Sequence, residues 1–273
     1  MKKNIVLLML GIYSTSFPSD LSTIIGTNTG IFAKEKEDKD SLIYIADNFH
    51  EMATLPGLTL GAPAGLVPSY GVLFTGLSGR KDRDKIDGAL ALGMGFGNSD
   101  TIGGAISLGV GSIDPRDGGS FDRGDLEISV GHDFKEYGIG WSAGVMGIDL
   151  WHAKGIDGRK QKPSFYTAIT KLWANDYVPM AITGGFGNNS FANINTENNR
   201  ENKIDGFGAL SFYLMPQLSL IVDYTSNILT SGFSLVPFPD YPISLNLGAT
   251  NLNEQGPENK VAVIGSIGAA YIF

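Results

Sequence analysis

Few side chains in this sequence have the types and spacing that catalysis or metal binding requires. The chain has no cysteine, and its three histidines lie far apart. His152 and Ser164 flank one polar stretch. A nucleophilic serine also needs an orienting group and an oxyanion donor, and the sequence shows neither. The glycine clusters at 93–97 and 184–187 lack the G-x-G-x-x-G spacing of dinucleotide sites. We therefore expect no enzymatic activity, no bound metal and no cofactor.

The charged side chains that do follow a pattern are acidic. They occupy the small or polar face of segments whose other face is apolar: Asp87, Glu127, Asp133, Asp205 and Asp223. The chain carries 28 acidic and 20 basic residues, a net charge of −8. This balance argues against a nucleic-acid partner, whose phosphates need a basic surface. If the segments are strands around a pore, these five carboxylates line the lumen and favour cations.

Apolar and polar residues alternate with the period of a β-strand along most of the chain. In residues 217–225, for example, Leu218, Leu220 and Val222 occupy one face, while the other face carries three polar residues and one isoleucine: Ser219, Ile221, Asp223 and Thr225. About twelve such segments can be counted, each close to the ~10 residues expected of a membrane strand. Their predicted starts are Ser69, Asp87, Thr101, Asp125, Gly138, Ser164, Val178, Ile204, Gln217, Ile228, Pro242 and Lys260. No run of residues after the N-terminus is long and apolar enough for a membrane helix.

The connections between these segments alternate between long and short. The longer, polar connections are residues 79–86, 113–124, 151–163, 188–203 and 252–259, while 98–100, 135–137, 174–177, 215–216 and 238–241 are short. This asymmetry is typical of barrels with long outer loops and short periplasmic turns. The outer connections supply cations such as Arg80 and Lys81, which could pair with the lumen carboxylates or bind lipopolysaccharide phosphates.

The N-terminus has the pattern of a secretory signal peptide. Lys2 and Lys3 precede the apolar stretch 5–12, which is far shorter than the ~20 residues of a membrane helix. Small residues allow cleavage after Ser16 or after Ala33, and we take residues 1–33 as the signal peptide.

The C-terminus ends in an apolar strand pattern. The uncharged run 261–273 is a strand that ends on an aromatic residue, with Tyr271 and Phe273 at its end. This ending resembles the assembly signal of Gram-negative outer-membrane β-barrels. The resemblance implies an all-β fold, an antiparallel transmembrane barrel over residues 69–273, and a location in the cell outer membrane. It also implies contact with outer-membrane lipid, lipopolysaccharide and the barrel assembly machinery.

Residues 34–68 admit two interpretations. Apolar residues within 40–53 have roughly helical spacing, whereas Pro56, Pro63 and Pro68 break any regular element after them. This segment is either a periplasmic tail or a plug that enters the lumen. An open lumen predicts a narrow, weakly cation-preferring pore for small polar solutes or ions. A filled lumen predicts a plugged structural barrel whose outer loops bind a partner or lipopolysaccharide.

Overall fold

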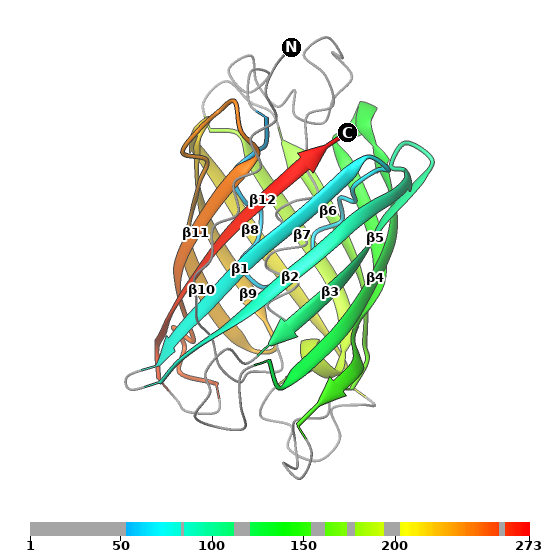
Figure 1. Cartoon of the computed structure of the whole chain (residues 1–273). Helices are drawn as coiled ribbons and strands as arrows, with labels where there is room; N and C mark the ends of the chain where they lie inside the picture. Colours follow the sequence, from blue (N-terminus) through cyan, green and yellow to red (C-terminus); the bar gives the residue numbers. More distant parts are fainter. Residues whose placement is uncertain are drawn as a thin grey trace.

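The protein is a closed antiparallel β-barrel of twelve strands, counted over the described residues. The computed structural model describes residues 53–82, 85–111, 121–153, 162–173, 178–193, 203–256 and 260–273. Each strand pairs with the next along the chain, and β1 pairs with β12 to close the sheet (Figure 1). The predicted fold class and strand number are therefore confirmed. The predicted signal peptide and the helical spacing in residues 40–52 lie outside the described residues.

The strands differ in length from eight to fourteen residues. They are β1 (Val72–Asp82), β2 (Lys85–Asn98), β3 (Ile102–Gly111), β4 (Arg123–Phe134), β5 (Ile139–His152), β6 (Ser164–Trp173), β7 (Met180–Asn188), β8 (Ile204–Met215), β9 (Leu218–Thr225), β10 (Ile228–Leu235), β11 (Ile243–Thr250) and β12 (Ala262–Ile272). Two single-turn 3-10 helices, η2 (Lys135–Tyr137) and η3 (Asn189–Phe191), lie in connections. Among the described residues, no helix has the length and apolarity that a membrane crossing requires.

Strand starts predicted from alternation agree closely with those observed. The largest offset is three residues, between the predicted Ser69 and the observed Val72. The first outer connection is shorter than predicted, because β1 continues to Asp82 and β2 already begins at Lys85. Arg80 and Lys81 therefore belong to a strand and not to a loop. The C-terminus and the short connections lie at one end of the barrel in Figure 1, and the β1–β2 connection lies at the other.

Side chains on the two faces of the wall differ in chemistry. On β9, Ser219, Ile221, Asp223 and Thr225 are buried, whereas Leu220, Val222 and Tyr224 are exposed. Successive side chains of a strand point to opposite faces, so the buried set faces the lumen and the exposed set faces outward. The outward set continues around the barrel with Leu92, Phe165, Ile169 and Phe186 among its most exposed members. An apolar exterior around a closed sheet is what a hydrocarbon environment requires.

We predict that a charge in the middle of this apolar exterior destabilises the barrel far more than a charge at its end. Val222→Arg on β9 should lower the free energy of unfolding in lipid vesicles by about 2–4 kcal/mol. Phe238→Arg, in the short β10–β11 connection, should lower it by about 0–1 kcal/mol because it lies near the interface. Urea unfolding followed by tryptophan fluorescence measures both values. Equal costs for the two variants would contradict a lipid-facing belt at Val222.

Candidate functional site in the barrel lumen

The lumen is occupied by a part of the chain itself. Residues 54–68, here called the inner segment, are buried throughout except at Gly61, and they run inside the barrel as the blue trace of Figure 1. Just before the segment, the Ala53 amide donates to the Pro239 carbonyl oxygen at 2.7 Å. At its far end, the Gly104 amide donates to the Pro68 carbonyl oxygen at 3.1 Å. Both contacts involve strands or connections at the periplasmic end, so the segment enters and leaves on the same side.

The inner segment turns deep in the barrel, where it is held by a buried carboxylate. The Asp223 Oδ2 atom accepts hydrogen bonds from the amides of Leu60, Gly61 and Ala62 at 3.1, 3.0 and 2.9 Å. The Thr225 hydroxyl donates to the other oxygen, Oδ1, at 2.8 Å. Three successive amides that converge on one anion form a concave nest for negative charge. Hydrogen bonds to an ionised acceptor are also stronger than neutral ones.

Hydroxyl side chains of the wall satisfy other backbone groups of the inner segment. The Gly57 amide donates to Ser234 Oγ at 2.7 Å, and the Gly57 carbonyl oxygen accepts from Ser219 Oγ at 2.8 Å. Further along, Ser142 Oγ donates to the Ala64 carbonyl oxygen at 2.8 Å. The Gly65 amide donates to Thr170 Oγ1, also at 2.8 Å. An irregular buried chain cannot pair its own backbone groups, so the inward serines and threonines supply the partners.

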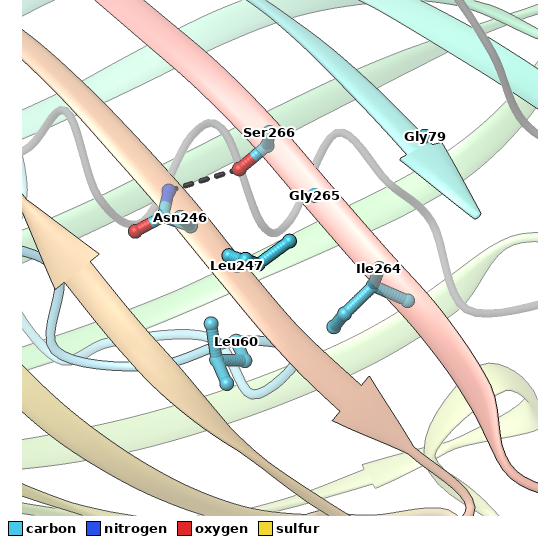
Figure 2. A pocket seen from close by; sticks show the side chains of 7 residues that line it. All are labelled: Leu60, Gly79, Asn246, Leu247, Ile264, Gly265 and Ser266. Carbon is cyan, nitrogen blue, oxygen red and sulfur yellow. Dashed lines mark hydrogen bonds between the residues drawn. The ribbon is translucent and has the colours of Figure 1, made fainter. Parts of the chain in front are cut away.

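Apolar side chains of the inner segment pack against three parts of the wall. Leu55, Leu58, Ala64 and Leu66 form one buried cluster with Leu172, Ala181, Tyr213 and Val236. Ala62 belongs to a second cluster with Met146, Tyr166, Ala168, Phe191, Phe207 and Ala209. Leu60 packs with Ile221 and Ile264 in the third. In Figure 2, Leu60 lies close to Ile264, near the Asn246 to Ser266 hydrogen bond of 2.9 Å. These clusters hold the segment by burial as well as by hydrogen bonds.

Glycines of the wall make room for the inner segment. A side chain at Gly131 would lie 2.8 Å from Val67 Cγ1. A Cβ at Gly65 itself would overlap the Gly140 carbonyl oxygen and the Thr170 amide nitrogen. Gly61 is different, because a Cβ there meets only Asp223 Oδ1, at an ordinary 3.7 Å. The segment therefore touches backbone at Gly65 and has free space at Gly61.

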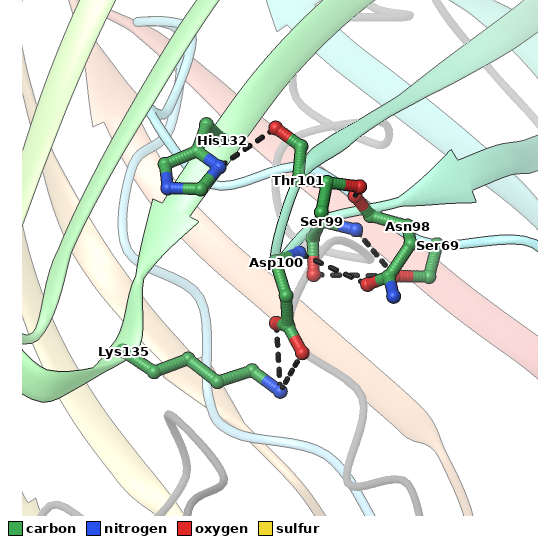
Figure 3. Close-up of polar contacts among 7 residues, drawn as sticks. All are labelled: Ser69, Asn98, Ser99, Asp100, Thr101, His132 and Lys135. Atoms are coloured by element: carbon green, nitrogen blue, oxygen red, sulfur yellow. Dashed lines mark hydrogen bonds and ion pairs between the residues drawn. The ribbon is translucent and has the colours of Figure 1, made fainter.

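Polar contacts fix the point where the segment leaves the lumen (Figure 3). The Ser99 amide donates to Ser69 Oγ at 2.9 Å, and the Ser99 carbonyl oxygen accepts from the Asp133 amide at 2.7 Å. Next to them, Lys135 Nζ pairs with Asp100 at 2.8 Å. This ion pair is partly exposed, and such pairs contribute little to stability. The exit is thus anchored mainly by the part-buried hydrogen bonds between Ser69 and the β2–β3 connection.

Two of the five predicted carboxylates contact the inner segment. Asp223 holds its turn as described, and Asp133 accepts hydrogen bonds from the Val67 amide and the Ser99 hydroxyl. Both lie at inward positions of their strands and are buried. The sequence predicts these carboxylates on the lumen side, but it does not indicate that backbone amides of residues 60–62 and 67 donate hydrogen bonds to them.

The other three predicted carboxylates face groups of the wall or of an outer connection. Asp87 lies directly opposite Arg80 in the β1–β2 register, and both side chains are buried. Glu127 is hydrogen-bonded with the Tyr166 hydroxyl. Asp205 is half-buried and accepts a hydrogen bond from the Asn193 amide at 2.8 Å. The five side chains are therefore dispersed around the lumen, and each has a separate partner.

No described residues combine into a catalytic or metal-binding arrangement of the kinds considered from the sequence. Ser164 Oγ donates to Ser190 Oγ at 2.8 Å, whereas His152 Nδ1 lies 2.8 Å from Asp149 Oδ2. Ser164 is aligned with Met146 on β5, six residues from His152. Within the described part of the chain, no group of three or more His, Cys, Asp and Glu side chains is arranged to hold a metal ion.

The terminal residues lie at the periplasmic rim, where β12 meets β1. The Phe273 amide donates to the Gly71 carbonyl oxygen at 2.9 Å. Tyr271 and Phe273 are exposed, and their rings stack with centroids 6.3 Å apart. An exposed aromatic pair at a strand end fits a membrane-interface girdle. Its role as an assembly signal stays a prediction.

Comparison with known proteins gives structural neighbours and no family. No protein-family model matches the chain, and no curated protein matches it. The barrel is similar to the NanC porin, with 10% identity, a TM-score of 0.42, and coverage of 74% of this chain and 99% of that chain. It is also similar to an outer membrane channel from Pseudomonas putida F1, with 11% identity, a TM-score of 0.44, and 74% and 96% coverage. Outer membrane phospholipase A from Escherichia coli has 11% identity, a TM-score of 0.42, and 75% and 93% coverage.

Sequence identities of 10–11% indicate a similar fold and nothing more. The structures found include both channels and an enzyme. The class follows from the molecule itself, since its sheet is closed and its exterior is apolar. Only helices and closed barrels can span a bilayer, because every backbone group in hydrocarbon needs an internal partner. The protein is a transmembrane β-barrel of the outer-membrane class.

We predict that the two glycines of the inner segment respond differently to a methyl group. Gly65→Ala should loosen the segment, because its Cβ overlaps backbone atoms of β5 and β6, and such overpacking costs about 1–3 kcal/mol. Gly61→Ala should change little, because the space there is open. Limited proteolysis of the protein in vesicles, with cleavage mapped to residues 54–68, measures the effect. Equal cleavage rates in the two variants would contradict the close contact at Gly65.

Proposed function

We propose that the protein is an outer-membrane channel for small polar solutes or ions that is held closed by its inner segment. The observation that carries the proposal is the position of residues 54–68, which fill the lumen and bond to its wall. Passage through the barrel requires the segment to leave. The proposal assigns no catalytic role to any residue.

The shape of the inner segment favours withdrawal as a unit. It enters and leaves at the periplasmic end, so it can move out on that side without passing through a closed ring of strands. It has no strand or helix of its own and is held by separate bonds to the wall. The inward serines and threonines that it would leave behind can bond to water instead, as the lining of an aqueous pore does. Its buried leucines oppose departure, so the closed state is the resting state.

Departure of the segment would also create the cation preference. Asp223 would lose three amide donors, and Asp133 would lose the Val67 amide. Asp87 would keep Arg80 opposite it in the register. The net effect is a lumen with newly unpaired negative charge, which attracts cations and repels anions.

A permanently plugged barrel is the second candidate. It is favoured by the burial of Leu55, Leu58 and Leu60, each of which is only 1% exposed. In that case the lumen has a structural role, and the outer connections bind a partner or lipopolysaccharide. The two candidates differ in whether any condition opens the barrel.

Conductance of the full-length mature protein in planar bilayers, with variants of the Asp223 contact, tests the proposal. Asp223→Ala removes the acceptor of three amides, and bonds to charged groups contribute about 1.5–3 kcal/mol each. Loss of even one such bond should raise the open probability about tenfold or more. Asp205→Ala is the matched control, because Asp205 bonds to Asn193 and not to the inner segment.

A crosslink between the inner segment and the barrel wall should have the opposite effect and keep the channel closed. The chain has no native cysteine, and Ser142 Oγ lies 2.8 Å from the Ala64 carbonyl oxygen, so cysteines introduced by Ala64→Cys and Ser142→Cys lie within reach of a short thiol-reactive crosslinker that forms reducible bonds. Crosslinking should abolish the openings of the Asp223→Ala protein, and reduction should restore them. Openings that persist after crosslinking, or a silent Asp223→Ala protein, would favour the permanently plugged barrel.

Ion selectivity is a separate expectation. Under a salt gradient, the reversal potential of the open Asp223→Ala channel should indicate a weak preference for cations, which the remaining lumen carboxylates supply. Adding Asp133→Asn to this variant should reduce the preference, because it removes a second lumen charge. The reversal potential of single openings measures this directly. An anion preference in the open state would contradict the acidic lumen while leaving gating by the inner segment intact.

A further inference from the structure

The outer surface of the barrel has a groove along the line where the sheet closes. This groove, here called the seam groove, has a volume of about 530 Å³ and lies over β11, β12, β1 and the start of β2. Leu77, Leu245 and Ile267 stand at one end, and they are adjacent to one another in the strand register. Val263 and Ile86 stand at the other end, where both are register partners of Lys81.

The floor of the seam groove is formed by two glycines. Gly79 and Gly265 face each other across the β1–β12 pairing. A Cβ built on Gly265 meets only the Asn246 carbonyl oxygen at 3.6 Å and Leu247 Cδ1 at 3.7 Å. Leu247 is an outward, exposed side chain. The missing side chains therefore leave a depression on the outer face, in the middle of an apolar surface.

Most residues that line the groove occupy outward positions of their strands. Lys81, Val263 and Ile86 are exposed, whereas the intervening residues Ser78 and Arg80, which also border the groove, are buried. On the lumen side of the same wall, Leu60 and Ile264 belong to one buried cluster, and both are labelled in Figure 2. The exposed side chains of the seam groove are therefore accessible from the bilayer and from the outer rim.

The charge of the groove is at its outer end. Lys81 lies one residue from the end of β1, at the rim opposite the C-terminus (Figure 1). An ammonium group at that depth meets the head groups of the outer leaflet, while the apolar walls lie beside the acyl chains. A basic side chain near anionic head groups strengthens lipid binding.

We propose that the seam groove is a binding site for one lipid A molecule, the phosphorylated and acylated anchor of lipopolysaccharide. One acyl chain lies over Gly79 and Gly265 between the apolar walls, and a phosphate group pairs with Lys81. The site combines the two features that such a lipid presents, an apolar chain and an anionic phosphate at fixed separation. It is independent of the state of the lumen.

Native mass spectrometry of the delipidated, refolded full-length protein, titrated with purified lipid A in detergent, tests the proposal. We expect one lipid A per barrel. Gly265→Phe should weaken binding at least tenfold, because each methylene of the chain that it displaces contributes about fourfold. Lys81→Gln should weaken binding about fivefold through the lost charge. Gly184→Phe is the control: Gly184 also faces outward with open space, but it lies on β7, away from the groove.

Several outcomes would overturn the proposal. If the Gly265→Phe variant, the Gly184→Phe variant and the wild-type protein bind lipid A with equal affinity, the lipid binds outside the seam groove. Equal affinity for phosphatidylglycerol would show that the groove is not selective for lipid A. A dimer that is lost only in Gly265→Phe would assign the groove to a second copy of the barrel. Heat-dependent gel migration, which reports barrel folding, verifies that each variant is folded before titration.

Discussion

The obligation to pair every buried backbone group determines both the wall of this protein and the content of its lumen. In hydrocarbon, twelve strands satisfy it by closing β12 onto β1. Inside the barrel the same obligation applies to the inner segment, which forms no strand or helix. Its amides and carbonyl oxygens are therefore bonded to side chains that point inward from the wall, with the three amides on Asp223 as the densest group of contacts.

The alternation of the strands lets these two requirements coexist. One face of each strand presents apolar side chains to lipid, and the other presents serine, threonine, aspartate or glycine to the lumen, together with apolar residues such as Leu172 and Ile221 that pack against the inner segment. Hydroxyls and carboxylates give bonds to the inner segment, and glycines such as Gly131 and Gly140 give it room. A lining of this kind can also accept water in place of the segment, which is why a closed barrel and a conducting one are both compatible with the same wall.

Most of the wall could be predicted from the sequence, because alternation is a local property. The strand starts, the strand number and the inward positions of Asp87, Glu127, Asp133 and Asp223 follow from period two. The polar stretch 79–86 predicts an outer connection that includes Arg80, but Arg80 lies in β1 opposite Asp87. If the alternation of β1 is extended by two residues beyond Ser78, Arg80 falls on the same inward face as Ser78.

The path of the inner segment could not be predicted, because its contacts are long-range and not periodic. Leu60 and Asp223 are 163 residues apart, and Gly65 and Thr170 are 105 apart. A stretch broken by Pro56, Pro63 and Pro68 is compatible both with a tail outside the barrel and with a plug inside the lumen.

The central claim is that residues 54–68 occupy the lumen of the resting protein, and cysteine labelling tests it most directly. The native chain has no cysteine, so a single Ala64→Cys variant in vesicles can be compared with a Tyr70→Cys variant. Ala64 is 3% exposed and Tyr70 is 66% exposed. A membrane-impermeant maleimide should react with the cysteine at 64 on the order of 100-fold more slowly, because access requires local opening of the segment. Equal labelling rates at the two positions would place the segment outside the barrel and contradict the account.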